Sequence, residues 1–407
     1  MQGADYFFNA ISPTVSLTCV LGICPVFIGY KEKRPVLYTH KYLYYISVAF
    51  VLFYSFLLLQ TISETRSKMM SNNFYQSNKV SNVGIAFEFF ASVTYFYSTY
   101  FSCVLKADSL KNTIMKIHKV DVVLERMGQD LRYKQMIFYQ LATQLPPLLT
   151  IIVNAYMQNQ NIKREGFRPI SLSTWFIFVF PVYVVNIFEY QFSYIVLLVH
   201  SRFAMLNSQL RKLKEHEGKV FQWKLEDAQL PETLRKVDTL MRMYDHLCDV
   251  ACELSVNYTL PVVVILAFQY GIILFSIFYC YWMFTLKPYS ALCWLIWALI
   301  NITEVLHTSI ACHLASVEAS VTASVVHKLL LKSYHKEVMY KLMSFSRLLM
   351  HRRVKFTIWG MFPYDASLIF IIVGAAATYM TIMLQFQQAS LPMTCKVSTV
   401  NNNSAIH

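Results

Sequence analysis

Long apolar runs recur along the chain at the length needed to cross a lipid bilayer. A membrane-spanning helix takes about 20 mostly apolar residues, because lipid leaves exposed backbone groups without hydrogen-bond partners. The hydrophobic pattern therefore predicts an all-α, polytopic membrane protein. Seven transmembrane helices are expected, at residues 42–62, 82–105, 135–157, 171–199, 256–284, 291–314 and 366–387.

A further apolar stretch, residues 12–28, precedes the first predicted span. Pro13, Gly22 and Pro25 interrupt it, and it also carries Ser and Thr. We expect a re-entrant or interfacial piece here; a full crossing would place the N-terminus on the opposite side of the membrane. The first residues lack the basic charge of a secretory signal, so no cleaved signal peptide is expected.

Basic residues are distributed unevenly between the two predicted sides of the membrane. Of the 36 Lys and Arg, 28 lie in the N-terminal segment and in the loops after the second, fourth and sixth spans. Because basic loops stay in the cytoplasm, we expect the N-terminus inside and the C-terminus outside. A G-protein-coupled receptor has the inverse orientation, so the charge pattern disfavours that class. The glycosylation sequon that begins at Asn402 would then lie on the outer side.

Three of the basic loops carry an apolar stripe at helical spacing. Steps of three and four residues connect apolar positions along 110–131, 234–254 and 329–349, which predicts an amphipathic helix in each. Such helices could lie flat on the inner leaflet or pack together as a bundle. We favour the bundle, because the stripes are narrow and the opposite faces carry both signs of charge. Residues 222–229 break the pattern and are expected to form a disordered insert.

Composition supports a membrane protein and excludes other classes. Of 407 residues, 56% are hydrophobic and 14% are charged, against about a quarter charged in soluble domains. The net charge of +13 fits membrane orientation, so we expect no nucleic-acid partner. The chain lacks a phosphate-binding Gly-rich loop and the HExxH and GxSxG motifs, so we expect neither an enzyme nor a cofactor.

The last predicted span carries a short motif. Thr378 and Tyr379 are followed by five mostly hydrophobic residues and then by Gln385 and Phe386. This arrangement, in the final span of an inverted seven-helix chain of this length, resembles the insect gustatory receptors. Thr381 is a polar departure from the hydrophobic positions of the motif.

The resemblance implies a ligand-gated, non-selective cation channel, a homotetramer or heterotetramer related to the insect odorant receptors. In that family the last helix lines a central pore and cytoplasmic helices anchor the subunits. Carried over residue by residue, Gln385 and Phe386 are expected to be gate elements, and Thr378 and Tyr379 to brace the same helix. The expected partners are a small-molecule tastant, permeating cations and the lipid bilayer, and the expected location is the plasma membrane of a sensory neuron.

Five regions follow from the orientation and the resemblance. They are a cytoplasmic N-terminal segment (1–41), transmembrane helices one to six with a ligand pocket and cytoplasmic helical loops (42–314), cytoplasmic anchor helices (315–365), a pore-lining last helix (366–387) and an extracellular tail (388–407).

The chemistry of the motif agrees with its implied place at a pore. Four copies of Gln385 around an axis would offer a ring of amide oxygens to a partly dehydrated cation, and a ring of Phe386 could close by dewetting. Small residues just before the motif, Gly374 to Ala377, permit close helix approach. The alternative is that Gln385 only sits in the interface at the end of a span.

Ionisable residues inside a span are functional candidates, because a charge in hydrocarbon is costly. Glu88, Glu189, Glu304 and His307 qualify. Glu304 and His307 share a helix face and could form the proton relay of a transporter, but we favour a polar contact that holds the bundle or lines a vestibule. We expect no metal site, because His307 and His313 lack an evident third ligand.

Depth in the predicted spans indicates the walls of a ligand pocket that opens outward. We expect aromatic faces with a few polar groups, at Glu88, Tyr95, Asn154, Trp175, Trp282, Trp294, Trp297 and Asn301. The tryptophans could instead anchor the helices at the membrane interface. Many sugar receptors of the family have Glu directly after the Thr-Tyr pair, whereas this chain has Met380. We therefore expect a receptor for bitter or other non-sugar compounds, with a fructose-type sugar receptor as the alternative.

Overall fold

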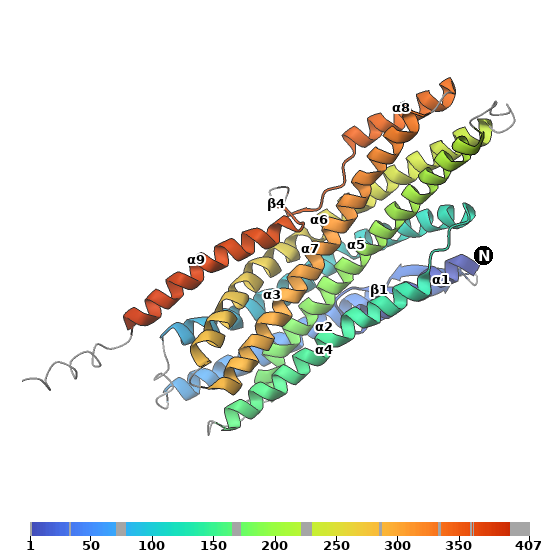
Figure 1. Ribbon diagram of the computed structural model, residues 1–407. Helices are drawn as coiled ribbons and strands as arrows, with labels where there is room; N and C mark the ends of the chain where they lie inside the picture. The colour runs from blue at the N-terminus through green and yellow to red at the C-terminus, as the bar shows by residue number, and fades with distance from the viewer. Residues whose placement is uncertain are drawn as a thin grey trace, which may run out of the picture.

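The computed structural model describes residues 2–31, 34–70, 79–164, 172–220, 230–284, 287–332, 335–358, 360 and 362–390. Within these residues the chain is almost wholly helical (Figure 1). The elements are α1 (Gln2–Val20), β1 (Val26–Lys31), β2 (Arg34–Thr39), α2 (Lys41–Met70), α3 (Lys79–Arg126), α4 (Tyr133–Arg164), α5 (Leu172–Val220), α6 (Leu230–Met283), α7 (Pro288–Leu330), α8 (Lys336–His351), β3 (Thr357–Ile358), β4 (Phe362–Pro363) and α9 (Ser367–Ser390).

Four helices, α3, α5, α6 and α7, are much longer than a membrane crossing requires. The longest, α6, has 54 residues, which is about 80 Å at the rise of an α-helix, whereas the hydrocarbon core is about 30 Å thick. Figure 1 shows these helices running side by side, with α8 beside one end and α9 extending toward the other. Three of them, α5, α6 and α7, therefore continue without a break beyond a segment apolar enough to cross a membrane.

The predicted amphipathic stripes are buried in these extensions. Ile117 and Leu124 of α3, Leu240 and Leu247 of α6 and Phe345 of α8 are fully shielded from solvent and belong to one core cluster. The extensions thus pack against one another within a single chain, as the bundle interpretation predicts, instead of lying separately on a membrane surface. The predicted disordered insert, residues 222–229, lies outside the described residues.

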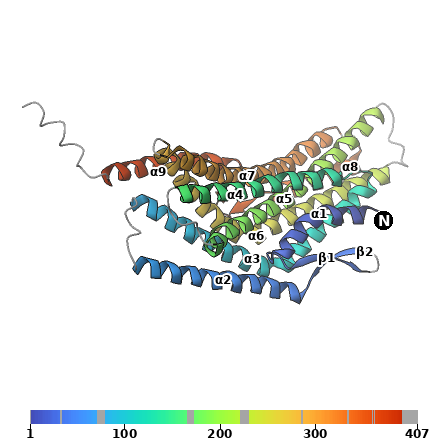
Figure 2. The same cartoon turned by 90° about the horizontal axis from the view of Figure 1, so that it is seen from below.

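The N-terminal region differs in detail from the sequence expectation. Helix α1 passes through Pro13, ends at Val20 and buries Phe7, Phe8 and Ile11 in the core. The chain turns at Gly22, whose φ of 65° suits a residue without a Cβ, and the Ser47 hydroxyl donates to the Gly22 carbonyl at 2.6 Å. An antiparallel hairpin, β1–β2, follows and lies near α1 in Figure 2. The sequence pattern did not reveal this hairpin.

Six of the described helices are long and apolar enough to cross a membrane. They overlap six of the seven predicted spans, and α9 in particular begins and ends close to the predicted last span. The remaining predicted span, residues 82–105, is helical within α3 but less apolar, because Tyr, Ser and Thr recur along it. Helix α5 is central, with 89% of its most apolar window buried, whereas the corresponding window of α9 is 0% buried.

Candidate functional site

A cluster of buried polar side chains lies inside the membrane part of the bundle. Asn186 and Glu189 of α5, Gln269 of α6 and Glu304 of α7 are each at most 4% exposed. The Gln269 amide donates to Glu189 Oε2 at 3.0 Å and to Glu304 Oε2 at 2.8 Å. The Asn186 amide also donates to Glu304. Side chains from three central helices thus share one hydrogen-bonded network, which we call the polar cluster.

The two carboxyl groups of the polar cluster constrain its charge. Glu189 and Glu304 are held by the same Gln269 amide and are fully buried. Two negative charges so close together in a low-dielectric interior repel strongly, so such pairs retain one proton or take up a cation. Their hydrogen-bond donors here, Gln269 and Asn186, are neutral amides. The polar cluster is therefore suited to a positive charge or to hydrogen-bond donors.

Four of the predicted pocket residues gather beside the polar cluster. Tyr95 of α3 is buried, donates to the Ile265 carbonyl at 3.3 Å and lies within electrostatic range of Glu88, Glu189 and Glu304. The Trp297 side chain lies close to the Glu88 carboxyl group. Asn301 donates to the Trp297 carbonyl at 2.9 Å. Tyr95 thus links α3 to α6, and Glu88 of α3 lies close to Trp297 of α7. Asn301 bonds within α7, three residues before Glu304.

The other predicted pocket residues do not join this group through any described contact. Trp294 packs on Tyr279, with ring centroids 4.7 Å apart. Trp282 is half-buried near the end of α6, and Asn154 is buried on α4. The side chain of Trp175 lies outside the described residues. Their assignment to a pocket stays a prediction.

Sequence reasoning missed the neutral members of the polar cluster. Glu189 and Glu304 stand out as ionisable residues within apolar runs, whereas the amides Asn186 and Gln269 carry no charge. The signal was present, because each is an amide within an apolar run. An amide in hydrocarbon also needs partners, and in this chain those partners are the two carboxyl groups.

Glu304 and His307 share a face of α7, but their side chains have hydrogen-bond partners on different helices. Glu304 pairs with Gln269 and Asn186. The His307 ring pairs through Nε2 with the Tyr139 hydroxyl of α4, at 3.0 Å, and packs on Tyr190. These are structural contacts between helices, as we favoured, and a Glu304–His307 proton relay is not built. Among the described residues, no three His, Cys, Asp or Glu side chains gather as a metal site.

The motif residues of the last span lie on an open helix. In the single chain α9 packs only against α6 and α7 among its stronger contacts. Thr378, Tyr379, Gln385 and Phe386 are all exposed, Phe386 by 68%. Tyr379 meets Tyr270 of α6 edge to face, with centroids 6.3 Å apart. The motif therefore stands at a surface that other subunits or lipid must cover.

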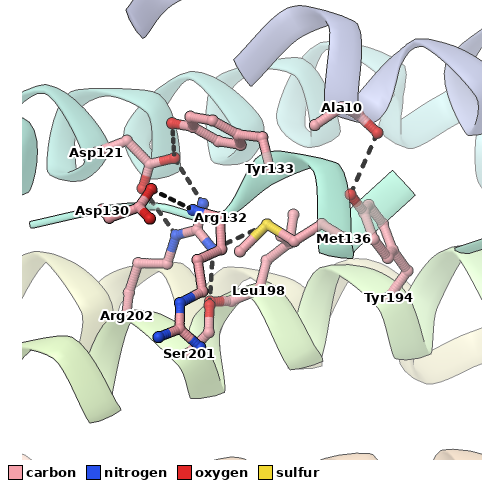
Figure 3. Close-up of polar contacts among 10 residues, drawn as sticks. All are labelled: Ala10, Asp121, Asp130, Arg132, Tyr133, Met136, Tyr194, Leu198, Ser201 and Arg202. Carbon is pink, nitrogen blue, oxygen red and sulfur yellow. Dashed lines mark hydrogen bonds and ion pairs between the residues drawn. The ribbon is translucent and has the colours of Figure 1, made fainter. Parts of the chain in front are cut away.

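A buried ion pair fixes the junction of α3, α4 and α5 (Figure 3). Arg202 of α5 donates to both oxygens of Asp121 of α3, from Nε to Oδ1 at 2.7 Å and from Nη2 to Oδ2 at 2.6 Å. Tyr133 of α4 donates to Asp121 Oδ2 at 2.9 Å, and Arg202 Nη1 donates to Ser201 at 2.6 Å. Every charged atom thus has a partner, as a buried pair requires.

Comparison with known proteins identifies the family. The sequence model of the 7tm chemosensory receptors matches residues 11–390. The chain belongs to the 7tm chemosensory receptor family. The resemblance drawn from Thr378, Tyr379, Gln385 and Phe386 is thereby confirmed. With six helices apolar enough to cross a membrane, this chemosensory receptor is a multi-pass membrane protein.

Relatives of this chemosensory receptor are found among curated sequences and solved structures. Two are from Drosophila melanogaster: “Putative gustatory receptor 28a”, 24% identical over 99% of this chain and 97% of its own length, and its counterpart 28b, 25% identical over 74% and 68%. The insect olfactory receptor OR5 from Machilis hrabei has the same fold, with a TM-score of 0.63 at 9% identity over 94% of this chain and 100% of its own. Its complex with eugenol gives a TM-score of 0.64 at 8% identity.

Proposed function

We propose that this chain is a gustatory receptor that acts as a tastant-gated, non-selective cation channel in the plasma membrane of sensory neurons. Membership of the chemosensory receptor family and relatives named as gustatory receptors support the sensory role. The related olfactory receptor in complex with eugenol supports recognition of a small organic molecule by this fold. The excess of basic residues in alternate loops supports a cytoplasmic N-terminus and an extracellular C-terminus.

A polar stripe on α9 is the observation that carries the channel proposal. Gly374, Thr378, Thr381 and Gln385 are spaced by four, three and four residues, so they share one helix face, and all four are exposed in the single chain. Thr378 and Thr381 can satisfy their hydroxyls on backbone carbonyls of α9. Gln385 is exposed near the end of the helix, and an amide facing lipid is costly. A water-filled pore along an axis shared by four subunits would supply hydrogen-bond partners to the Gln385 amide.

The stripe also suggests how the channel conducts and closes. A ring of four Gln385 amides supplies oxygen ligands to a cation that has lost part of its hydration shell, and the adjacent Phe386 ring is apolar enough to dewet. Small residues at Gly374 and after it let the helices approach closely at the inner end. In this proposal Gln385 and Phe386 form the gate, and Tyr379 braces α9 against Tyr270 of α6.

We place the ligand beside the polar cluster, where Glu88, Tyr95, Trp297 and Asn301 meet. Two neighbouring carboxyl groups that accept hydrogen bonds from neutral amides favour a ligand that carries a positive charge or several hydrogen-bond donors. A protonated amine, common among bitter compounds, fits this chemistry. Met380 at the position after the Thr-Tyr pair also favours a non-sugar ligand. A fructose-type receptor is the alternative, because a sugar supplies hydroxyl donors to the same acceptors.

Expression of the chain alone in a non-insect cell line tests the proposal. Whole-cell current is recorded while quinine, denatonium, caffeine, sucrose and fructose are applied in turn, with G-protein signalling blocked. We expect a cation current evoked by an amine and insensitive to the block. Gln385→Ala should alter ion selectivity or gating at normal surface expression, whereas Val373→Ala, at an exposed position of α9 outside the polar stripe, should not. Evoked current that needs G proteins, or a Gln385→Ala channel identical to the wild type, would contradict the proposal.

A further inference from the structure

Tyr364 lies between the polar cluster and the start of α9. It precedes Ser367, the first residue of α9, and is only 3% exposed. Its ring stacks on Phe192 of α5, with centroids 6.4 Å apart and planes at 7°. Phe192 is one helical turn from Glu189 of the polar cluster. A residue of the linker to α9 is thus inserted into the central helices.

The backbone before Tyr364 is held on α6. The Tyr364 amide donates to the Phe356 carbonyl at 2.9 Å, next to the short pairing of β3 with β4. Ser255 of α6 donates to the Thr357 carbonyl at 3.1 Å. Upstream, Arg352 forms ion pairs with Asp245 and Asp249 of α6. The linker before Tyr364 is therefore held on α6, so a displacement of Tyr364 is expected to move the chain that follows it, at the start of α9.

The chain after Tyr364 transmits such movement directly to α9. Asp365 Oδ1 accepts hydrogen bonds from the Ser367 amide at 2.8 Å and from its hydroxyl at 2.6 Å. This is the contact of an N-terminal cap, which fixes the first turn of a helix. Leu368 then packs against the main core. We therefore expect Tyr364 and the first turn of α9 to move together.

The Tyr364 hydroxyl faces the polar cluster without a settled partner. It is buried and makes no direct hydrogen bond of good geometry among the described residues. Its polar neighbours are Thr308 of α7 and the Glu189 carboxyl group. The Thr308 hydroxyl accepts from Ser193 at 3.0 Å and donates to the Glu304 carbonyl at 3.1 Å, so only its second lone pair is open to Tyr364. A buried unpaired hydroxyl is unfavourable, so a rearrangement of Glu189 or Thr308 changes the preferred position of Tyr364.

We propose that Tyr364 is the positioning residue that couples the polar cluster to α9, so that a change in the hydrogen bonding of Glu189 and Thr308 moves the base of the pore helix. This inference rests on the proposed channel function. Ligand binding beside the cluster redistributes the hydrogen bonds of Gln269, Glu189 and Glu304. The Tyr364 hydroxyl then gains or loses a partner, and the Asp365 cap carries the displacement into α9.

A matched pair of single-atom deletions tests the coupling. Tyr364→Phe removes the hydroxyl that faces the cluster. Tyr258→Phe is the control, because Tyr258 is also buried, also packs on Phe192 and also has an unpaired hydroxyl, but it belongs to α6 and not to the linker that leads into α9. Surface expression, half-saturating concentration and maximal open probability are measured with the compound of the panel above that activates the wild type most strongly.

We expect Tyr364→Phe to lower the maximal open probability about 5-fold or more, the lower range of typical coupling between sites. Surface expression and the apparent affinity in a ligand-induced thermal-shift assay should stay near wild type. Tyr258→Phe should leave all of these quantities unchanged. An unaltered maximal open probability in Tyr364→Phe, or an equal loss in Tyr258→Phe, would overturn the coupling. Absence of evoked current in the wild type would instead contradict the proposed channel function.

Two measurements keep the inference testable if Tyr364→Phe folds poorly or no current is found. Asp365→Ala removes the cap without touching the cluster and should reproduce the loss of open probability. In the purified protein, hydrogen exchange over residues 367–374 should rise in Tyr364→Phe relative to Tyr258→Phe. Equal exchange in the two variants, or normal gating in Asp365→Ala, would refute the coupling.

Discussion

Replacing Asp121 by Ala should destabilise the protein strongly, because it isolates the Arg202 charge. The Arg202 side chain is 0% exposed and that of Asp121 is 2% exposed. Asp121 accepts two of the hydrogen bonds of Arg202 and one from Tyr133. Without it, Ser201 and the Met136 sulfur are the remaining hydrogen-bond acceptors of the guanidinium group among the described residues. An unpaired buried charge of this kind costs about 3–5 kcal/mol.

The expected loss can be read as a thermal shift. At about 2 °C per kcal/mol for a large domain, Asp121→Ala should lower the apparent Tm by roughly 6–10 °C. The assay heats detergent-solubilised protein and measures, by size-exclusion chromatography, how much of the monodisperse peak remains at each temperature. The control is Glu232→Ala, which removes an exposed ion pair whose Lys236 Nζ and Glu232 Oε1 atoms are 2.7 Å apart. This change should alter stability by less than about 1 kcal/mol.

A double variant separates the lost charge pair from a general defect. Asp121→Leu with Arg202→Met removes both charges and retains volume, and such replacements of buried pairs are often neutral or stabilising. We expect this double variant to recover most of the Tm lost by Asp121→Ala. The reasoning is wrong if Asp121→Ala shifts the Tm no further than Glu232→Ala, or if the double variant is less stable than the single one.

Three further substitutions test local packing, backbone strain and burial. A Cβ at Gly271 would overlap the Phe87 ring. Gly271→Ala should therefore cost about 1–3 kcal/mol in thermal melts, and an unchanged Tm would show that α3 and α6 separate easily. Gly128 lies in the turn just after α3, with a φ of 75° and nothing within 4 Å of a built Cβ. Gly128→Ala should therefore lower stability by about 1 kcal/mol through backbone strain alone; a larger loss would indicate contacts there. Burial lowers the pKa of His118, although Asp121 and Glu125 oppose the shift. The folded state therefore disfavours protonation of His118 and should lose stability as the pH falls below about 6.5. His118→Gln should reduce the change in Tm between pH 5 and 7, and an unaltered pH profile would show that His118 does not cause it.

The transmembrane pattern was predictable from the sequence because hydrocarbon imposes it locally. Each apolar run must hydrogen-bond its own backbone, and the runs ending at Ile62 and Gln387 mark helices that the structure contains. The stripes through Leu124, Leu247 and Phe345 were equally readable, since a buried face must repeat at the helical period. The motif at the end of α9 identified the family correctly.

Other features depend on contacts between distant segments, which no local pattern specifies. Gln269 becomes part of a site only because α5 and α7 bring Glu189 and Glu304 to it. The β1–β2 hairpin is short and lies beside α1, which continues through Pro13 because tertiary packing outweighs the local preference. The insertion of Tyr364 between central helices likewise requires the path of the linker after α8.

Chemical modification of position 385 tests the pore assignment most directly. Gln385→Cys is compared with Leu52→Cys, a position 64% exposed on the outer helix α2, and a membrane-impermeant cationic thiol reagent is applied from outside during evoked current. We predict that the reagent reduces the current carried by Gln385→Cys, faster when the channel is open, and leaves Leu52→Cys unchanged. The contradicting result is a Gln385→Cys channel that expresses and conducts normally, whose cysteine is labelled by the reagent, and whose evoked current does not change on labelling. That result would exclude a pore lined by α9 at this position.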